Sequence, residues 1–530
     1  MSEKLKVLLL DNIDPVSAEI LAERGIKGEL YSKLTPEELK THIKDAVGIV
    51  VRSATQVDEA LLAKAPNLKV VGRAGVGVDN IDIDAATRRG VLVMNTPDGN
   101  TISTAEHTCG LILSLVRNIP NAVASLKAGR WDRKKYLGTE VHGKTLGVVG
   151  LGKIGSGVAQ RMLSFGMHVV GFDPYMTNER ARELGIKLVD MDELFASSDI
   201  ITVHTPLTEK TRNLISKEQS SKLKKGVKLV NCARGGIFNE ADLLDMLNDG
   251  TVSELALDVY SSEPPTEDMR ALLEHPHVVC TPHLGASTEE AQEKVAVQIA
   301  HQLADALELK DFKGSINGKS IALSTNAELQ PYLKLAEQMG RFCIQLAGWN
   351  VKELTIEYTG KCGSHAEVLT DAFLAGYLHQ IDEAPVNLIN ARYLADGKGI
   401  RIREIKESSS GTFSELMTVH IGGAEAFSRV SGAVFGDTDF RVVGINSLQI
   451  EVQLHGNLII YKNVDKPGML AAVSSKLAQE DINIASLSLG RNPANMRAVT
   501  AIAIDKPADK QTLEDIAAID GVEYLTSLSL

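Results

Sequence analysis

Gly150-Leu-Gly-Lys-Ile-Gly155 decides the fold of this chain, because the residues on either side of it complete a phosphate-binding turn. The apolar run 145–149 before it is of strand type, and 158–163 after it is typical of a helix. The glycines permit a tight turn and let a pyrophosphate approach the amide groups at a helix N-terminus. The segment therefore predicts a strand, a turn and a helix in succession, as in a nucleotide-binding domain.

A second strand-like run, 168–172, ends in Asp173, where a dinucleotide site places an acidic residue. Its carboxylate is expected to accept hydrogen bonds from the adenosine ribose. Pro174 follows instead of a cation, and a carboxylate repels a 2′-phosphate, so the expected cofactor is NAD rather than NADP. A glycine-rich turn alone also occurs in ordinary strand–helix connections, but here all parts of the motif occur together.

The composition is that of a globular chain too long, at 530 residues, for one ordinary domain. A net charge of -12 argues against nucleic acid as a general partner. No apolar stretch has the length of a signal peptide or a membrane span, so a cytoplasmic protein without a membrane partner is expected. Neither a disulfide framework nor a metal site is expected from the cysteines, which show no CxxC spacing: Cys109, Cys232, Cys280, Cys343 and Cys362.

Strand-like and helix-like runs alternate over the first 94 residues and again after the glycine turn. Such alternation predicts two parallel sheets covered by helices on both faces. We expect a first domain of residues 1–98 with 287–312 and a nucleotide-binding domain of residues 99–286. An apolar helix at 104–116 bridges them, and one from 287 to about 309 returns the chain.

The remaining chain changes character twice. Residues 316–452 contain one long helical run and then many short alternating segments, which is typical of an α+β domain. Residues 456–530 follow the order strand, helix, strand, strand, helix, strand, which is ferredoxin-like. The expected fold class is therefore α/β, with two Rossmann-like parallel-sheet domains followed by an α+β domain and a ferredoxin-like domain.

Arg234, Glu263 and His283 each follow a predicted strand of the nucleotide-binding domain, on the side of the sheet where ligands bind. Histidine titrates near neutral pH and can exchange a hydroxyl proton, and a carboxylate at its other nitrogen would orient it. Arginine holds a substrate carboxylate with two parallel hydrogen bonds. Taken singly, each residue has an ordinary structural explanation; together they predict hydride transfer from a hydroxyl-bearing carbon.

Several segments of the chain resemble a known family. Residues 150–155 with Asp173, 204–206, 231–236, 258–264 and 282–288 look like the successive signatures of the D-2-hydroxyacid dehydrogenases. Residues 51–55 and 72–82 resemble the phosphoglycerate-oxidising branch of that family. Residues 456–530 resemble an ACT domain, a small amino-acid sensor, and 316–452 the extra regulatory (allosteric substrate-binding) domain of the long members.

The resemblance implies NAD-dependent oxidation of 3-phospho-D-glycerate to 3-phosphooxypyruvate, which begins L-serine biosynthesis. It implies that Arg234 binds the substrate carboxylate, that Glu263 orients the histidine, and that His283 is the acid and base. It also implies a larger set of NAD contacts, with Asp258 reaching the nicotinamide amide: Gly150, Gly152, Lys153, Ile154, Gly155, Asp173, Thr205, Cys232, Ala233, Arg234, Asp258, His283, Leu284, Gly285 and Ala286. Val76 stands where the family often has threonine, which preserves a backbone contact but not a hydroxyl contact to the cofactor.

Two further ligand sites are expected. The candidates for the substrate phosphate are Arg52, Ser53, Arg73, Gly75, Gly77 and Asn100, with exposed amides at the two glycines. Arg133, in the basic run 133–135, reaches a neighbouring subunit's site or is simply solvated, and the chain is expected to form a homodimer or homotetramer. In the last domain Asn463, Asp465 and Asn483 resemble effector-binding positions, with L-serine as the candidate effector; the alternative is that Asp465 only caps a helix.

Two rival functions use the same fold. Another 2-hydroxyacid, such as glycerate, lactate, glyoxylate or 2-hydroxyglutarate, would employ the same three residues, and Arg52 with Arg73 are what favour a phosphorylated one. An NAD-sensing co-repressor would have no need of an amino-acid-sensing tail.

Overall fold

The computed structural model describes residues 5–348, 351–379, 381, 385–408, 413–424, 426–492, 494 and 496–530. The chain forms two compact units. The first comprises Met1–Arg73, Val78–Asn95 and Ile299–Leu530, and the second comprises Ala74–Gly77 and Thr96–Gln298. Each unit has its own sheets and cores.

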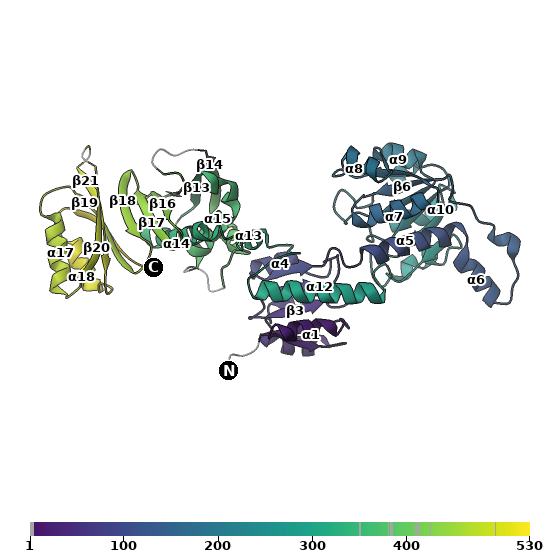
Figure 1. Ribbon diagram of the computed structural model, residues 1–530, viewed down its shortest axis with the longest axis horizontal. Coiled ribbons are helices and arrows are strands. Elements are labelled where there is room, and N and C mark those ends of the chain that lie inside the picture. Colours follow the sequence, from purple (N-terminus) through teal and green to yellow (C-terminus); the bar gives the residue numbers. More distant parts are fainter. Residues whose placement is uncertain are drawn as a thin grey trace. The chain divides into compact units, whose positions relative to one another are not determined.

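The first unit begins with a five-stranded parallel sheet in the order β2-β1-β3-β4-β5. Its central strand β3 is wholly buried, as expected for a parallel sheet covered on both faces. Helix α12 runs beside this sheet, next to the label of β3 in Figure 1. It packs so closely from Ile299 onward that a Cβ on Gly72 of β4 would lie 2.8 Å from the Ile299 side chain. The strand bounds are Lys6–Leu9 (β1), Lys27–Leu30 (β2), Gly48–Val51 (β3), Val70–Arg73 (β4) and Leu92–Asn95 (β5), and α12 runs Glu289–Leu307.

The second unit contains a seven-stranded parallel sheet in the order β12-β11-β10-β9-β6-β7-β8. Apolar residues of α5 (Thr101–Val116) and α7 (Lys153–Ser164) form a core on one face, and those of α9 (Met191–Ser197) and α10 (Glu240–Asn248) form a core on the other. The two parallel sheets confirm the predicted Rossmann-like pair. The strands are Thr145–Val149 (β6), His168–Phe172 (β7), Lys187–Leu188 (β8), Ile200–Val203 (β9), Val227–Asn231 (β10), Val252–Leu257 (β11) and Val278–Cys280 (β12).

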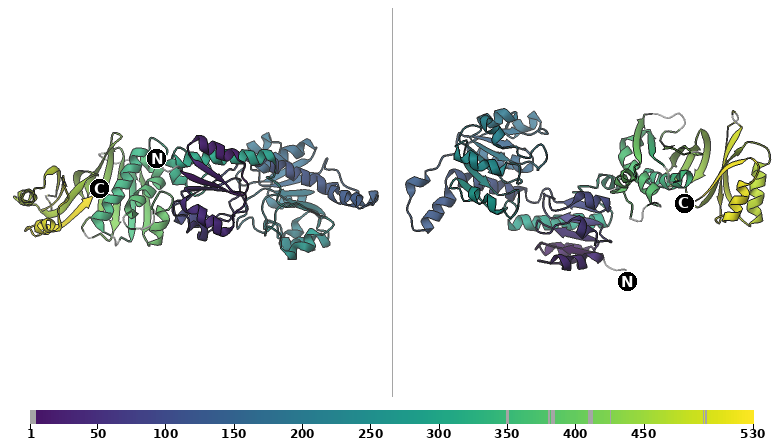
Figure 2. Two further views of the ribbon diagram at one scale, coloured as in Figure 1. Left: turned by 90° about the horizontal axis from the view of Figure 1, so that it is seen from below. Right: turned by 180° about the vertical axis from the view of Figure 1, so that it is seen from behind.

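Helix α6 (Ile119–Lys127) and the segment after it stand away from the body of this unit (Figures 1 and 2). Within the described residues no single helix is long and apolar enough to span a membrane. Only α5 and α6 taken together reach that length and composition, and they are bent by 65°.

The first unit continues into a six-stranded sheet in the order β14-β13-β15-β16-β17-β18. Strands β13 and β14 are parallel and the other neighbours antiparallel, which confirms the α+β character expected from the sequence. Helices α14 (Gln330–Ala347) and α15 (Ala366–Leu378) cross where Gly340 and Gly376 let their backbones approach. The strands are Glu353–Thr359 (β13), Arg401–Glu407 (β14), Leu416–Gly422 (β15), Arg429–Phe435 (β16), Asp439–Ile445 (β17) and Leu448–Gln453 (β18).

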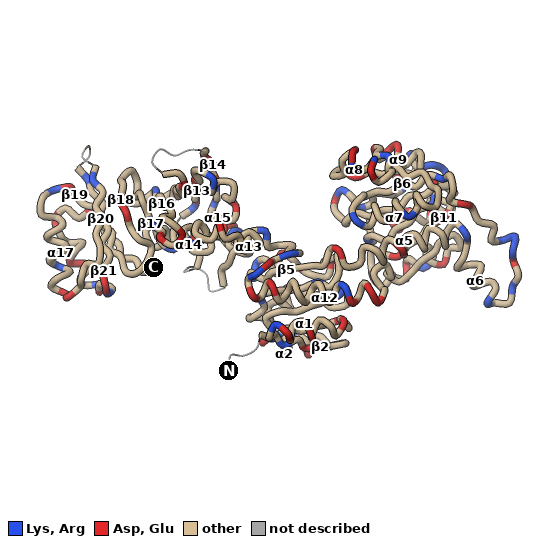
Figure 3. Tube along the Cα trace, viewed as in Figure 1, with Lys and Arg blue, Asp and Glu red and all other residues tan. Residues whose placement is uncertain are grey.

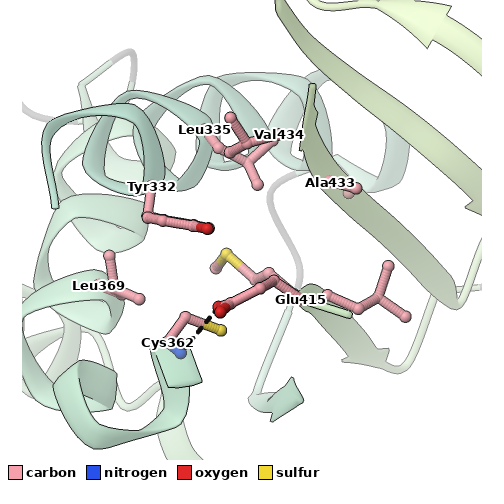
Figure 4. A pocket seen from close by; sticks show the side chains of 10 residues that line it. Tyr332, Leu335, Cys362, Leu369, Glu415, Ala433 and Val434 are labelled. Atoms are coloured by element: carbon pink, nitrogen blue, oxygen red, sulfur yellow. Dashed lines mark hydrogen bonds between the residues drawn. The ribbon is translucent and has the colours of Figure 1, made fainter. Parts of the chain in front are cut away.

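A small cavity lies between α14 and this sheet, with Tyr332, Cys362 and Glu415 on its wall (Figure 4). The Glu415 carboxylate accepts a hydrogen bond from the Cys362 amide at 2.9 Å. The cavity has a volume of about 10 Å³, which leaves room for one water molecule at most. The cavity is therefore too small to hold a metabolite.

The last domain has the predicted order of elements and a four-stranded antiparallel sheet, β20-β21-β19-β22, which is the ferredoxin-like arrangement. Its two helices cover one face of the sheet. The other face, including Leu458 and Leu528, joins the core of the preceding domain. The elements are Asn457–Val464 (β19), Met469–Gln479 (α17), Ile484–Asn492 (β20), Arg497–Ile504 (β21), Lys510–Ala517 (α18) and Val522–Ser529 (β22).

Candidate active site

The glycine turn joins the end of β6 to α7, whose first turn follows Gly152. Gly150 has a φ of +90°, which glycine adopts without the steric cost of a side chain. A Cβ on Gly155 would lie 1.9 Å from the Gly150 carbonyl oxygen, so only glycine allows this approach of helix and strand. No atom lies within 4 Å of the place a Cβ would take on Gly152. The open amides at this helix start fit a pyrophosphate.

The carboxylate of Asp173, at the end of β7, is tied to the same turn. It accepts hydrogen bonds from the amides of Leu151 and Tyr175, both at 2.8 Å. Nearby, the buried Thr205 hydroxyl has no hydrogen-bond partner among the described residues. Buried polar atoms are rarely left without a partner, so this orphaned hydroxyl fits a polar group of a bound ligand.

His283 and Glu263 form the central pair of the candidate active site. The Nδ1 atom of His283 lies 2.6 Å from Oε2 of Glu263. With Nδ1 directed at the carboxylate, the other ring nitrogen, Nε2, is left to exchange a proton with a ligand. His283 has a φ of 54° and follows β12 by a turn in which its amide donates to Thr281.

Arg234 lies in a turn that is locked to the segment carrying Glu263. Asn231 donates to the Arg234 carbonyl oxygen at 2.8 Å and accepts from the Ala233 amide at 2.9 Å, which fixes the turn after β10. A Cβ on Gly235 would lie 1.9 Å from the Tyr260 carbonyl group. The Tyr260 amide in turn donates to Glu263 at 3.2 Å. The three predicted chemical residues therefore belong to one connected set of strand-end turns.

Asp258 is a buried acid that is hydrogen-bonded to the turn carrying His283. Its side chain is fully buried, and its carboxylate accepts hydrogen bonds from the Thr281 hydroxyl at 2.6 Å and from the amides of Leu284 and Gly285 at 2.7 and 2.9 Å. Burial opposes ionisation, but hydrogen bonds from His107, Thr281 and Leu284 outweigh it and hold the Asp258 pKa below its usual value. The carboxylate thus holds the His283 turn, and its contact with a nicotinamide amide stays a prediction.

The other expected cofactor residues differ in their contacts and burial. Lys153 forms an ion pair with Asp98, and Ile154 packs against the core under α7. Cys232 is buried, and burial raises the pKa of its thiol to about 12, so it stays protonated. Ala233 is half-buried, and the remaining residues lie on the Asp258-bound turn: Leu284, Gly285 and Ala286.

The expected phosphate residues divide between the units. In the first unit Asn80 accepts from the Arg73 guanidinium at 3.3 Å and donates to the Arg52 carbonyl oxygen at 2.8 Å, so it holds the segments of both arginines; Ser53 is exposed beside Arg52. In the second unit the buried Gly75 amide donates to Thr96 at 2.8 Å, so the expectation of an exposed amide there is wrong.

Gly77, Asn100 and Arg133 also belong to the second unit. Gly77 is half-buried, and the Asn100 side-chain oxygen is buried without a partner among the described residues. Arg133 is exposed in the basic segment after α6, visible as a run of cationic residues in Figure 3.

Sequence reasoning missed the residues that support the candidate groups: Asn80, His107, Asn231 and Tyr260. Asn231 carried a signal, because it directly follows a buried strand. His107 carried none, since only the folded chain brings α5 to within 3.1 Å of Asp258.

Of the predicted effector residues, Asn463 and Asp465 come just before α17, whereas Asn483 follows α17 and lies at the other end of the sheet, beside Ile504. The buried side-chain oxygen of Asn463 has no partner in the described part of the chain, although its amide nitrogen donates to the Val464 carbonyl oxygen. Asp465 pairs with Arg491 at 2.9 Å, and α17 has Gly468 as its N-cap with no side-chain cap, so the alternative that Asp465 caps this helix is wrong. Asn483 donates to Asp505.

Comparison with known proteins gives the class first. Residues 109–285 match the family model described as the NAD binding domain of D-isomer specific 2-hydroxyacid dehydrogenases. A structure of D-lactate dehydrogenase from Aquifex aeolicus with NAD and lactic acid covers 57% of this chain and 96% of its own, at 30% identity and a TM-score of 0.51. The class of enzyme is therefore the one the strand-end residues indicated, and NAD is its cofactor.

The comparisons then narrow the class. Residues 328–446 match the intervening domain of D-3-phosphoglycerate dehydrogenase, and 457–521 match the ACT domain. The D-3-phosphoglycerate dehydrogenases of Archaeoglobus fulgidus and Bacillus subtilis are each 39% identical to this chain over 99% of its length, covering 100% and 99% of their own. The chain belongs to the D-3-phosphoglycerate dehydrogenase family.

Asp258→Asn is expected to destabilise the second unit and to reduce turnover. The new amide group would face the Leu284 or Gly285 N–H with a donor, and leaving a buried donor unpaired costs about 1–3 kcal/mol. Urea unfolding and steady-state kinetics measure the two effects. Asp192→Asn, an exposed change in the same unit, is the control. An unfolding free energy and turnover equal to the control's would contradict the role assigned to Asp258.

Proposed function

We propose that this chain oxidises C2 of 3-phospho-D-glycerate to 3-phosphooxypyruvate with NAD, as the first step toward L-serine. The observation that carries the proposal is the 2.6 Å contact between His283 and Glu263 at the ligand side of a nucleotide-binding sheet. The family membership gives the substrate class.

The roles follow from the chemistry of the oxidation. The C2 hydroxyl loses its proton to Nε2 of His283, and Glu263 stabilises the imidazolium that forms. Arg234 binds the substrate carboxylate and thereby orients C2. NAD supplies the acceptor for the hydride that leaves C2. In the reverse direction His283 returns the proton, because the same group acts as acid.

The cofactor is held by the residues of the glycine turn and of the neighbouring strand ends. The amides of Lys153 and Ile154, at the start of α7, bind the pyrophosphate, and the helix dipole favours its charge. The Asp173 carboxylate, already oriented by two backbone amides, binds the adenosine ribose and repels a 2′-phosphate. Thr205 provides a hydroxyl with unused hydrogen-bonding capacity.

Arg52 and Arg73 bind the substrate phosphate, and Asn80 keeps their segments in place. These two cations favour a phosphorylated substrate over an unphosphorylated hydroxyacid. We expect NAD reduction to be at least tenfold more efficient with 3-phosphoglycerate than with glycerate or 2-hydroxyglutarate, since a charge-assisted phosphate contact is worth about 1.5–3 kcal/mol. Comparable catalytic efficiencies with glycerate would reject the phosphorylated substrate while leaving the dehydrogenase chemistry standing.

His283→Ala should lose about two to four orders of magnitude in turnover, because general acid–base catalysis contributes a rate factor of that size. NAD affinity, measured by fluorescence titration, should stay near that of the wild type. His277→Ala, at an exposed histidine of the same unit, serves as control. Turnover of the His283 variant within a factor of about two of the control would remove His283 from the acid–base role.

The chain forms a homodimer through α6 and the segment that follows it. This arm presents apolar side chains to solvent, with Trp131 77% and Leu137 87% exposed. Apolar patches of this kind mark protein interfaces. Arg133 lies in the same arm and reaches the active site of the partner copy, where a cation adds to phosphate binding.

L-Serine binds the ACT domain and lowers activity. Asn463 supports this proposal, because its buried oxygen lacks a partner and can accept a hydrogen bond from a ligand's ammonium group. Asp465, 15% exposed, adds a carboxylate beside it.

Calorimetric titration of L-serine into the full chain should show binding that Asn463→Ala and Asp465→Ala each weaken at least tenfold, since a hydrogen bond to a charged group contributes about 1.5–3 kcal/mol. Glu480→Ala, at an exposed position of the same domain, should bind as the wild type does. Equal binding by all four proteins would move the site elsewhere, and no binding by the wild type would exclude serine as the ligand.

A further inference from the structure

Strand β14 (Arg401–Glu407) is an edge strand with an open side. It pairs with β13 and lies at the end of the six-stranded sheet, at the opposite end from β18 (Figure 1). The β18 edge is already in contact with the ACT domain, where the Glu451 amide donates to the Ser488 hydroxyl at 2.9 Å. Among the described strands of this sheet, β14 therefore has the edge that remains for another chain.

The hydrogen bonds at the two ends of β14 fix which of its backbone groups face outward. The Arg401 amide donates to Lys352, and the Glu407 carbonyl oxygen accepts from Gly360, so both residues direct their backbone groups toward β13 and its continuation. Backbone direction alternates along a strand. Residues 402, 404 and 406 therefore present their N–H and C=O groups to the open side.

This alternation restricts how two copies of β14 can pair around a twofold axis. Antiparallel hydrogen-bonded pairs must join outward-facing residues, so only every second register is allowed. In the register centred on Ile405, Glu404 lies opposite Lys406 of the partner subunit, and Arg403 lies opposite Glu407 of the partner subunit. The neighbouring allowed registers place Glu404 against Glu404 or Lys406 against Lys406. Of these three registers, only the one centred on Ile405 has no pair of like charges facing each other.

The side chains of β14 suit that register. Ile405, at its centre, is 44% exposed and would lie directly against Ile405 of the partner subunit. Lys406 and Glu407 are exposed and, within the described residues, have no ion-pair partner. Arg403 contacts Glu353 of β13 at 3.3 Å, and Glu404 is held by Arg392 at 2.8 Å, so both are oriented on the strand.

We propose that β14 pairs with β14 of a second copy of this chain, antiparallel and centred on Ile405, so that the two six-stranded sheets become one continuous sheet. A strand pair of this length is smaller than a standard interface of roughly 1,600 Å². It therefore joins chains that are also held elsewhere, and would convert dimers formed through α6 into tetramers.

The charged residues of β14 do not act as a guard against pairing. Edge strands are commonly protected by charges that repel an incoming strand. A row of one sign has that effect on a second copy of itself, whereas Arg403, Glu404, Lys406 and Glu407 alternate so that an antiparallel copy finds opposite charges. Cross-strand pairs of opposite charge stabilise an antiparallel sheet.

Cysteine cross-linking tests the register. In a Cys280→Ser background, which removes the exposed native thiol, Ile405→Cys should form a disulfide between copies under mild oxidation. A non-hydrogen-bonded pair places the two Cα atoms about 4.5 Å apart, within disulfide range. Arg403→Cys is the matched control, because its two copies would be offset by about 13 Å along the strands. Failure of Ile405→Cys to cross-link, or equal cross-linking of both variants, overturns the proposed register.

Charge reversal tests the pairing itself in the full-length protein. Lys406→Glu and Glu407→Lys should each weaken the β14-dependent association about tenfold or more in analytical ultracentrifugation, since each turns two symmetric attractions into repulsions. Glu407→Lys combined with Arg403→Glu should restore it. Lys334→Glu, on the exposed side of α14, is the charge-matched control and should leave the mass unchanged. If both single reversals sediment as the control does, the pairing is rejected, whether or not the enzyme is active.

Discussion

The buried carboxylate of Asp258 is the interaction on which the candidate active site depends. It directly follows β11 and receives hydrogen bonds from the turn after β12 and from His107 on α5, so three separate segments meet at one charge. A buried charge is costly unless it is fully hydrogen-bonded, and here it is. That requirement holds the His283 turn in its left-handed conformation and leaves the imidazole beside Glu263. The chemistry thus rests on a residue that need not touch the substrate.

The parts predicted from the sequence are those with local or topological causes. The glycine turn is local, because its backbone conformation and close approaches exclude side chains at Gly150 and Gly155. Arg234, Glu263 and His283 could be placed together because parallel strands deliver their carboxyl ends to the same edge of a sheet. The order of strands and helices in the last domain was enough to predict its ferredoxin-like sheet. Each of these inferences needed only residue type and position along the chain.

The contacts that the sequence could not predict depend on which partner binds a polar group. The sequence shows that Asp258 is acidic but not that two amides already occupy it, and it shows Gly75 but not that Thr96 accepts from its amide. Asp465 is a good helix cap by type, yet Arg491, 26 residues away in the chain, binds it instead. The supporting roles of His107 and Asn80 could not be predicted for the same reason. The tertiary structure decides which of several possible partners binds a polar group. A local sequence pattern does not specify such a contact.

Buried polar atoms that lack a hydrogen-bond partner also help to locate ligand sites. Folded proteins pair nearly all of their buried polar atoms, because an unpaired one costs about 1–3 kcal/mol. Asn100, Thr205 and Asn463 retain buried oxygens without a partner in the described residues, and each was selected from the sequence as a ligand-binding position on other grounds. Tyr377 and Gln338 are unpaired too, but they lie on helices of the intervening domain, far from any predicted ligand residue in the sequence. Unpaired atoms therefore do not identify a site by themselves. Where one coincides with a motif, it supports the proposed ligand site, because a ligand there could supply the missing hydrogen bond.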